Sequence, residues 1–252
     1  MNSSQMGAQA DMLVAERPRR VSPLLICIAF FVLLEVLQPF LTQLEAPYFK
    51  AIPMPPGAPP SWWHVDKSLA LIGSVNLILM IGPAYLYYLL RGRKFSSLGF
   101  NRGGTAIAWI LMLVVQGAVL ALDTRMGALG RAPGALGPYA LLASAIVAPC
   151  AGFSEETLFR GFMMEELRRG GFGALPQIAI SSIFFALAHY SFVFHFTLAD
   201  LSIPIFTGVL GAFYAFIYLV AKRSLWPTVV AHMINDAVLI PSVFYLIAQR
   251  SH

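Results

Sequence analysis

Long apolar stretches separated by short polar segments run through the chain, and this pattern predicts an all-helical (all-α) protein. The stretches lack the strict alternation of apolar and polar residues that predicts half-buried strands. Each stretch is long enough to cross a bilayer as a helix, which takes about 20 residues at a rise of about 1.5 Å per residue. We expect seven transmembrane helices, with an eighth or a short re-entrant segment as the alternative. The seven stretches are 21–41, 68–90, 105–122, 139–164, 175–195, 202–221 and 225–247.

The composition agrees with a protein that lies in a membrane. Hydrophobic residues make up 58% of the 252 positions and charged residues 12%, about half the charge content of a soluble domain. Too few polar groups remain to cover the surface of a soluble globule. We therefore predict a polytopic helical bundle in the cell membrane, surrounded by membrane lipid. Soluble enzymes, disordered chains and disulfide scaffolds are excluded.

The basic residues predict how the helices are oriented. With the N-terminus in the cytoplasm, eleven lysines and arginines fall in inside segments and five in outside segments, as the positive-inside rule requires. This bias predicts a cytoplasmic N-terminus and accounts for the pI of about 9.4. No basic stripe is interleaved with exposed aromatic residues, so no nucleic-acid partner is predicted.

The few polar side chains within the apolar stretches gather in the C-terminal half of the chain. An ionisable group at lipid depth is costly, so each one is a candidate for a functional role. Seven of the eight lie on three of the predicted helices. The set comprises Glu35, Glu155, Glu156, Arg160, His189, His232, Asn235 and Asp236.

Two adjacent glutamates on the fourth stretch have different surroundings. Glu156 and Arg160 are four residues apart, so they share a helix face and can form an ion pair. Glu155 points about 100° away from Glu156 and has no local partner. An unpaired carboxylate of this kind suits a general base. The alternative is that all three side chains form a polar link between helices.

The two histidines at lipid depth each allow more than one role. His189 lies in an apolar helix, where a hydrogen-bonded packing residue is the alternative to a catalyst. His232 has Asp236 one turn further on, which suits an oriented base, a pair of metal ligands or a clamp between helices. Helical rise puts His232, Glu155 and His189 at depths of about 10, 15 and 20 Å from the cytoplasmic side. Titratable groups at similar depth on three helices predict a water-filled cavity open to the cytoplasm.

Three short motifs in these stretches resemble those of the CPBP family, the CAAX-protease and bacteriocin-processing (Abi) intramembrane proteases. Residues 155–161 read Glu-Glu-Thr-Leu-Phe-Arg-Gly and resemble the first motif. Phe185 and His189 match the second motif, a phenylalanine four residues before a histidine. Residues 225–227 read Leu-Trp-Pro and, with His232, resemble the third. The three motifs occur in the family's order, each on its own apolar stretch.

The resemblance covers about residues 139–240, and the Leu-Gly-Phe sequence at 98–100 is a further, weaker match. It implies three regions: a cytoplasmic tail at 1–20, N-terminal helices and a linker at 21–104, and a protease core at 105–250. It also implies an intramembrane endopeptidase that hydrolyses peptide bonds of membrane-associated or CAAX-type substrates, including prenylated proteins. The alternative is a membrane protein without proteolytic activity, such as a bacteriocin self-immunity factor or a small transporter.

The family's catalytic roles fall on four positions of this chain. Glu155 and His189 would activate a water molecule, and His232 and Asp236 would stabilise the oxyanion. The supporting residues implied by the same motifs are Glu156, Arg160, Asn235 and Phe185.

The third motif departs from the family at Asp236, where asparagine is frequent. An ionised aspartate cannot donate a hydrogen bond to an oxyanion. We therefore consider three alternatives: Asp236 is protonated, it orients His232, or Asn235 supplies the donor.

A metal-dependent mechanism is a further alternative. Two histidines and two carboxylates make a zinc-binding set, here Glu155, His189, His232 and Asp236. The helical His-Glu-x-x-His signature of zinc proteases is absent from the sequence. We favour water activation without a metal.

Overall fold

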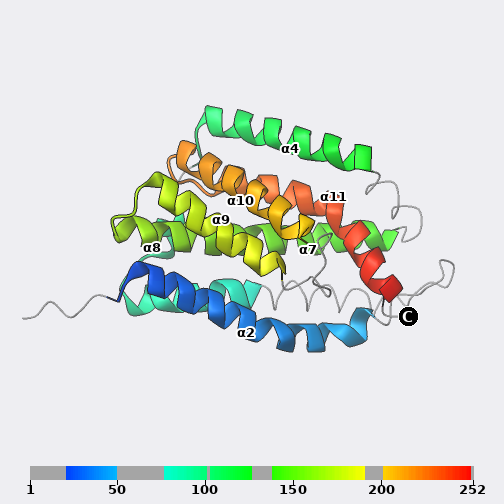
Figure 1. Cartoon of the computed structure of the whole chain (residues 1–252), viewed down its shortest axis with the longest axis horizontal. Helices are drawn as coiled ribbons and strands as arrows, with labels where there is room; N and C mark the ends of the chain where they lie inside the picture. The colour runs from blue at the N-terminus through cyan, green and yellow to red at the C-terminus, as the bar shows by residue number, and fades with distance from the viewer. Residues whose placement is uncertain (1–20, 50–76, 101–102, 127–137, 191–200, 251–252) are drawn as a thin grey trace, which may run out of the picture.

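The computed structural model describes residues 21–49, 77–100, 103–126, 138–190 and 201–250 (Figure 1). These ranges contain helices and turns and no strand, so the predicted all-helical fold class is confirmed for this part of the chain. The main helices are α2 (Pro23–Phe49), a helical segment at 77–90, α4 (Ala106–Met126), α7 (Pro138–Glu156), α8 (Met164–Arg169), α9 (Ala174–Tyr190), α10 (Ser202–Val220) and α11 (Trp226–Arg250).

Each of the seven predicted stretches coincides with helix over its described residues, apart from one or two residues at some ends, whereas 68–76 and 191–195 lie outside the described residues. Helices α4 and α11 end four and three residues later than predicted, and the two larger differences concern α2 and the fourth stretch. Helix α2 continues to Phe49 instead of ending near residue 41. The residues that follow position 41 include glutamine, leucine, glutamate and alanine, which favour a helix, and the helix also includes Pro39 and Pro47.

The fourth stretch is the second difference, because it is not a uniform α-helix. A π-helical segment, η2 (Thr157–Met163), joins α7 to α8, and each of its seven residues is buried. A π-helix bonds residue i to i+5, and such segments are frequent at functional sites. The two glutamates of the first motif stand at the end of α7, directly before this change of helix type.

The membrane prediction has no direct support from helix length and hydropathy. Within the stretches that the structure describes, none of the helices combines the length and the apolar character of a membrane span.

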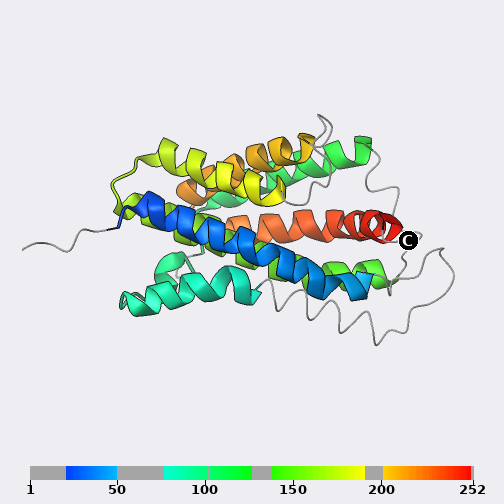
Figure 2. The same ribbon diagram turned by 60° about the horizontal axis from the view of Figure 1, so that its bottom comes forward.

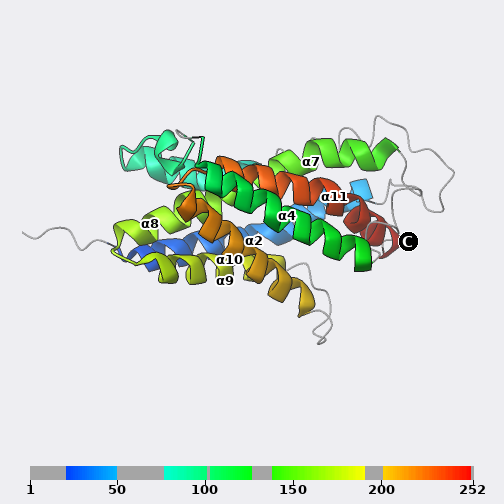
Figure 3. The ribbon, with the colours of Figure 1, turned by 90° about the horizontal axis from the view of Figure 1, so that it is seen from above.

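The helices run along the long axis of the molecule, with α4 on one side and α2 on the other (Figure 1). The closest packing pairs α7 with α11 and α9 with α10. Helix α11 lies in the middle of the bundle and also contacts α4 and α2 (Figure 2). From above, α4 extends over α10 and α11 (Figure 3), both of which it contacts. The third motif, on α11, is therefore packed against α7, which bears the first motif, and against α4, while α9, which bears the second, packs on α10.

A glycine sets the close approach of α7 to α11. A Cβ atom at Gly152 would lie 2.9 Å from the backbone nitrogen of Met233, closer than real side chains come. Gly152 is one turn before the two glutamates, and Met233 directly follows His232. This contact therefore holds the first and third motifs side by side.

The Leu-Gly-Phe sequence at 98–100 packs against both of these motifs. Gly99 has a φ of +113°, and a Cβ there would lie 2.6 Å from the carbonyl oxygen of Arg223. Its own carbonyl accepts a hydrogen bond from the backbone nitrogen of Leu225 at 3.0 Å. On the other side, the carbonyl oxygen of Leu98 would lie 2.9 Å from a Cβ at Gly161. The weaker match at 98–100 thus corresponds to a contact between the N-terminal half and the motif-bearing helices.

At one end of the bundle, an ion pair and a hydrogen bond join the 77–90 segment and the turn after it to α8. Glu166 is 2% exposed and accepts hydrogen bonds from the Arg93 guanidinium and, at 3.2 Å, from the Tyr87 hydroxyl. The Arg93 guanidinium also lies over the rings of Tyr87 and Tyr88. A nearly buried carboxylate is thereby paired, as its desolvation requires.

The neighbouring Glu165 is paired within its own helix. Arg168 donates two hydrogen bonds to it, at 2.7 and 2.6 Å, and Arg169 donates one at 2.9 Å. Burial raises the pKa of Glu165, but the hydrogen bonds from Arg168 and the charges of both arginines outweigh burial and hold the pKa below its ordinary value. Glu165 is therefore held in its ionised form.

Candidate active site

Glu156 links the first motif to the third. One of its oxygens, Oε1, accepts a hydrogen bond from Arg160 Nη1 at 2.8 Å and another from His232 Nδ1 at 3.0 Å. The side chains of Glu156 and Arg160 are fully buried, and that of His232 is 4% exposed. The predicted pairing of Glu156 with Arg160 is therefore present, and the same carboxylate also binds the histidine of α11.

This hydrogen bond assigns the orientation of the His232 ring. Because Nδ1 faces a carboxylate, it carries the proton in the neutral ring, and Nε2 is turned away from Glu156. Nε2 faces two other carboxylates: it is 3.7 Å from Glu155 Oε2 and 3.6 Å from Asp236 Oδ2. The residue that orients His232 is therefore Glu156, and Asp236 stands on the other side of the ring.

Arg160 is enclosed by aromatic rings and a backbone carbonyl. Its guanidinium carbon lies 4.3 Å from the ring centre of Phe185 and 5.6 Å from that of Tyr214. Its Nη2 donates to the carbonyl oxygen of Gly211 at 3.1 Å. A Cβ at Gly211 would lie 3.0 Å from Phe185 and 3.2 Å from Nη2, so the close approach of α10 depends on this glycine. The ring of the motif phenylalanine Phe185 thus packs against the arginine.

Glu155 lies between the two histidines. Its Oε2 is 3.8 Å from His189 Nε2 and 3.7 Å from His232 Nε2, and it accepts no hydrogen bond in the structure. Both separations exceed a direct hydrogen bond. The two side chains retain some exposure, 15% for Glu155 and 23% for His189, while the Oε2 atom itself is buried. One carboxylate oxygen thus faces a ring nitrogen of each histidine.

His189 is fixed by the phenylalanine of its own motif. Its Nδ1 is 2.8 Å from the carbonyl oxygen of Phe185, four residues earlier in α9. A carbonyl only accepts hydrogen bonds, so Nδ1 is the donor and Nε2 is the atom turned to Glu155. The spacing of the second motif thus sets which ring nitrogen faces the carboxylate.

The two candidates for the last polar position differ in burial. Asp236 is 18% exposed and shares the space beside His232 Nε2 with Glu155. Asn235 is 5% exposed, and its Oδ1 has no hydrogen-bond partner. It lies one turn beyond Ala231, which packs in the cluster that includes residues of α4. Glu35, the eighth predicted polar residue, is on α2, and none of the contacts described above includes it.

The metal alternative can be tested against the donor atoms. A tetrahedral zinc ion at about 2.0–2.1 Å from each ligand would hold the ligand atoms about 3.4 Å apart. The separations here are 3.6–3.8 Å. Among the described residues, no three histidine, cysteine, aspartate or glutamate side chains converge as a metal site does. The donor chemistry suits zinc but the spacing does not fit it, and we derive no step through a metal.

Two residues of the site were not predicted from the sequence. Tyr214 is fully buried, and its ring centre lies 5.7 Å from that of His232. Its hydroxyl accepts a hydrogen bond from Nε2 of Gln116 on α4. Tyr214 is one of nine tyrosines and gives no distinguishing signal. Gln116 could have been found, because it is a polar residue in the middle of the apolar stretch 105–122.

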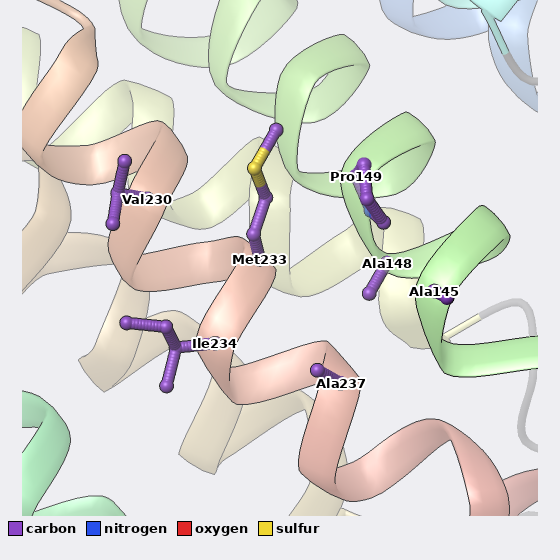
Figure 4. A pocket seen from close by; sticks show the side chains of 7 residues that line it. All are labelled: Ala145, Ala148, Pro149, Val230, Met233, Ile234 and Ala237. Carbon is purple, nitrogen blue, oxygen red and sulfur yellow. The ribbon is translucent and has the colours of Figure 1, made fainter. Parts of the chain in front are cut away.

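An apolar crevice of about 280 Å³ lies between α7 and α11, beside the contact of Gly152 with Met233. Figure 4 shows small and aliphatic side chains from both helices around it. None of the predicted site residues lines it. Its lining residues are Ala145, Ala148, Pro149, Val230, Met233, Ile234 and Ala237.

Comparison with known proteins agrees with the sequence motifs. Residues 137–238 match the family described as type II CAAX prenyl endopeptidase Rce1-like. No curated protein and no solved structure matches the chain. The matched range contains α7, α9 and the first half of α11, which bear the three motifs and the carboxylates and histidines described above. Residues 137–238 are therefore similar to an Rce1-like domain, in agreement with the predicted resemblance to CPBP intramembrane proteases.

Proposed function

We propose that this protein is an intramembrane endopeptidase that cleaves membrane-associated or CAAX-type substrates with a water molecule activated by Glu155 and His189. The observation that carries the proposal is the position of Glu155. Its Oε2 faces a histidine nitrogen on each side, at 3.8 and 3.7 Å, and no hydrogen bond occupies it. The Rce1-like family supports a CAAX-type endopeptidase as the class of enzyme.

The first step requires a water molecule between Glu155 and His189. The water donates one hydrogen bond to Glu155 Oε2 and the other to the lone pair of His189 Nε2. When the oxygen attacks the peptide carbonyl, its proton passes to Glu155, as in general base catalysis. The Nδ1 proton of His189 stays hydrogen-bonded to the Phe185 carbonyl oxygen, and this bond holds the ring in place during the step. The same carboxylic acid can then protonate the leaving amine.

The second requirement is a donor for the oxyanion. Glu156 holds His232 by Nδ1, so the ring presents Nε2 to Glu155 and Asp236. In the protonated ring, Nε2–H donates a hydrogen bond to the developing oxyanion. Asp236 lies 3.6 Å from the same nitrogen, and it can donate to the oxyanion only as the carboxylic acid. His232 is therefore the main donor, and Asp236 lies beside the same ring nitrogen.

We further propose that the protein lies in the cell membrane, with its N-terminus in the cytoplasm and lipid around the helices. Large hydrophobic side chains are exposed along three helices on the outside of the bundle. Soluble proteins rarely expose contiguous apolar surface of this extent. These side chains are Leu25, Ile28, Val32, Leu33 and Val36 on α2, Ile107, Ile110, Leu113, Val114 and Leu122 on α4, and Ile205, Phe206, Val209, Phe213 and Phe216 on α10.

The decisive experiment measures cleavage of a farnesylated CAAX peptide by the purified protein in lipid vesicles. Glu155→Gln and His189→Ala should each abolish cleavage, while Glu165→Gln, the same change in a carboxylate paired at the end of the bundle, should retain it. Cleavage by either site variant at the wild-type rate would refute the assignment of roles. If the wild-type protein cleaves neither farnesylated nor unmodified peptides but takes up solute along a pH gradient, it is instead a transporter.

A further inference from the structure

Helix α4 reaches the site from outside the Rce1-like domain. It ends at Met126, whereas the matched range begins at residue 137. One polar side chain of α4, that of Gln116, is 3% exposed and donates a hydrogen bond to the Tyr214 hydroxyl on α10. The Gln116 Oε1 atom is buried without a partner. A buried amide oxygen left unpaired costs stability, so bundle stability alone does not account for a glutamine at this position.

The ring of Tyr214 lies against two members of the site. Its centre is 5.7 Å from the His232 ring, with the planes at 43°, and 5.6 Å from the Arg160 guanidinium carbon. Arg160 and His232 are the two donors to Glu156 Oε1. Movement of the Tyr214 ring would therefore displace both groups that hold this carboxylate. The interior is closely packed, so such a displacement is transmitted and not absorbed.

We propose that Gln116 is a positioning residue of this site: by holding the Tyr214 hydroxyl, it fixes the ring against which Arg160 and His232 are placed. Helix α4 is then part of the catalytic unit although it lies outside the family domain. The link to catalysis rests on the proposed function, whereas the placement of His232 does not.

The test uses variants that remove the hydrogen bond and keep the shape. Tyr214→Phe removes the hydroxyl and leaves the ring, and Gln116→Met removes the amide in a side chain of similar length. The matched control is Tyr218→Phe, one turn along α10. Tyr218 is 1% exposed, packs with Met164, Leu225 and Val229, and has the Arg223 guanidinium carbon 5.8 Å from its ring centre, where Tyr214 has Arg160. A purely structural role for buried tyrosine hydroxyls would give the same result at both positions.

We expect Tyr214→Phe and Gln116→Met to lower kcat by roughly three- to tenfold with little change in KM, as the loss of one hydrogen bond allows. The double variant should be no worse than either single one, because both remove the same interaction. Gln116→Glu, which keeps a polar partner for the hydroxyl, should recover part of the rate. The control should retain the wild-type kcat. Equal kcat in Tyr214→Phe and wild type, or additive losses in the double variant, would overturn the proposal.

A measurement independent of activity separates this inference from the proposed function. The ring nitrogens of His232, observed by ¹⁵N NMR and assigned with His232→Gln, should show the Nδ1 proton bonded to a carboxylate. We expect these resonances to shift in Tyr214→Phe and Gln116→Met and to stay in place in Tyr218→Phe. If they shift but no peptide is cleaved, the proposed function fails and the positioning stands. If cleavage occurs but the resonances do not move, the positioning is wrong and the proposed function stands.

Discussion

Arg160 is the residue whose removal should disturb this protein most, and Arg160→Met is the change to make. The side chains of Arg160 and Glu156 are both fully buried and pair at 2.8 Å. Methionine keeps much of the apolar stem between Phe185 and Tyr214 but leaves the Glu156 charge with His232 as its one remaining donor. Removing one partner of a buried pair typically costs roughly 3–5 kcal/mol.

The charge of Glu156 should be the main reason for this loss. The double variant Glu156→Gln with Arg160→Met removes that charge and keeps an oxygen that can accept from His232. It should therefore recover about 2 kcal/mol or more of the free energy of unfolding, because the single variant's cost is mostly an uncompensated buried charge.

The assay is equilibrium unfolding of purified protein in mixed micelles, followed by circular dichroism. Wild type, Arg160→Met and the double variant are compared under one condition, with Arg168→Met as the control. Arg168 is 48% exposed and pairs with Glu165 at one end of the bundle, so its loss should cost at most about 1 kcal/mol. The prediction is refuted if Arg160→Met is as stable as wild type, or if the double variant is less stable than Arg160→Met.

Three further predictions concern other features. Cleavage of the farnesylated peptide should be unchanged after treatment with EDTA or 1,10-phenanthroline and gel filtration; a loss that zinc restores would assign the donor set to a metal. Gly152→Ala should destabilise the protein by roughly 1–3 kcal/mol, since its Cβ would lie 2.9 Å from the Met233 backbone nitrogen, and an unfolding midpoint equal to that of wild type would contradict the close contact. The lowered pKa of Glu165 stabilises the folded state above the carboxyl's ordinary pKa of 4.5, and this stabilisation is lost as pH falls through the lower folded-state pKa. Glu165→Gln should therefore have a lower free energy of unfolding than wild type at pH 6, and this free energy should fall less steeply below about pH 4.5. The same dependence of stability on pH in variant and wild type would disprove this.

The helix positions and the polar cluster were predictable because both depend on local sequence. Long apolar runs mark the helices whatever they pack against. Ionisable residues are rare in such runs, so Glu155, His189 and His232 stood out before their contacts were known. The described structure brings these three together from α7, α9 and α11.

The partner of His232 was not predictable from spacing. Asp236 is four residues away on the same helix and was a candidate to orient the ring. The orienting hydrogen bond comes instead from Glu156, 76 residues earlier in the chain. Such a contact depends on how α7 and α11 pack, which the spacing within one helix does not contain. Tyr214 was missed for the same reason, because its significance lies in the rings and charges around it.

The π-helical segment after the two glutamates has a consequence for insertions and deletions. A π-turn accommodates one more residue than an α-turn, so η2 is equivalent to a helix with one residue inserted. Deleting one residue between Thr157 and Met163 would let the segment become α-helical without rotating the helix that follows relative to α7, because the π-turn already absorbs the extra residue. Glu155 and Glu156 before the segment, and Glu165 and Glu166 after it, would then keep their partners. The side chains that change face are those within the segment itself, so a one-residue deletion here should disturb Arg160 and not the ion pairs at the end of the bundle.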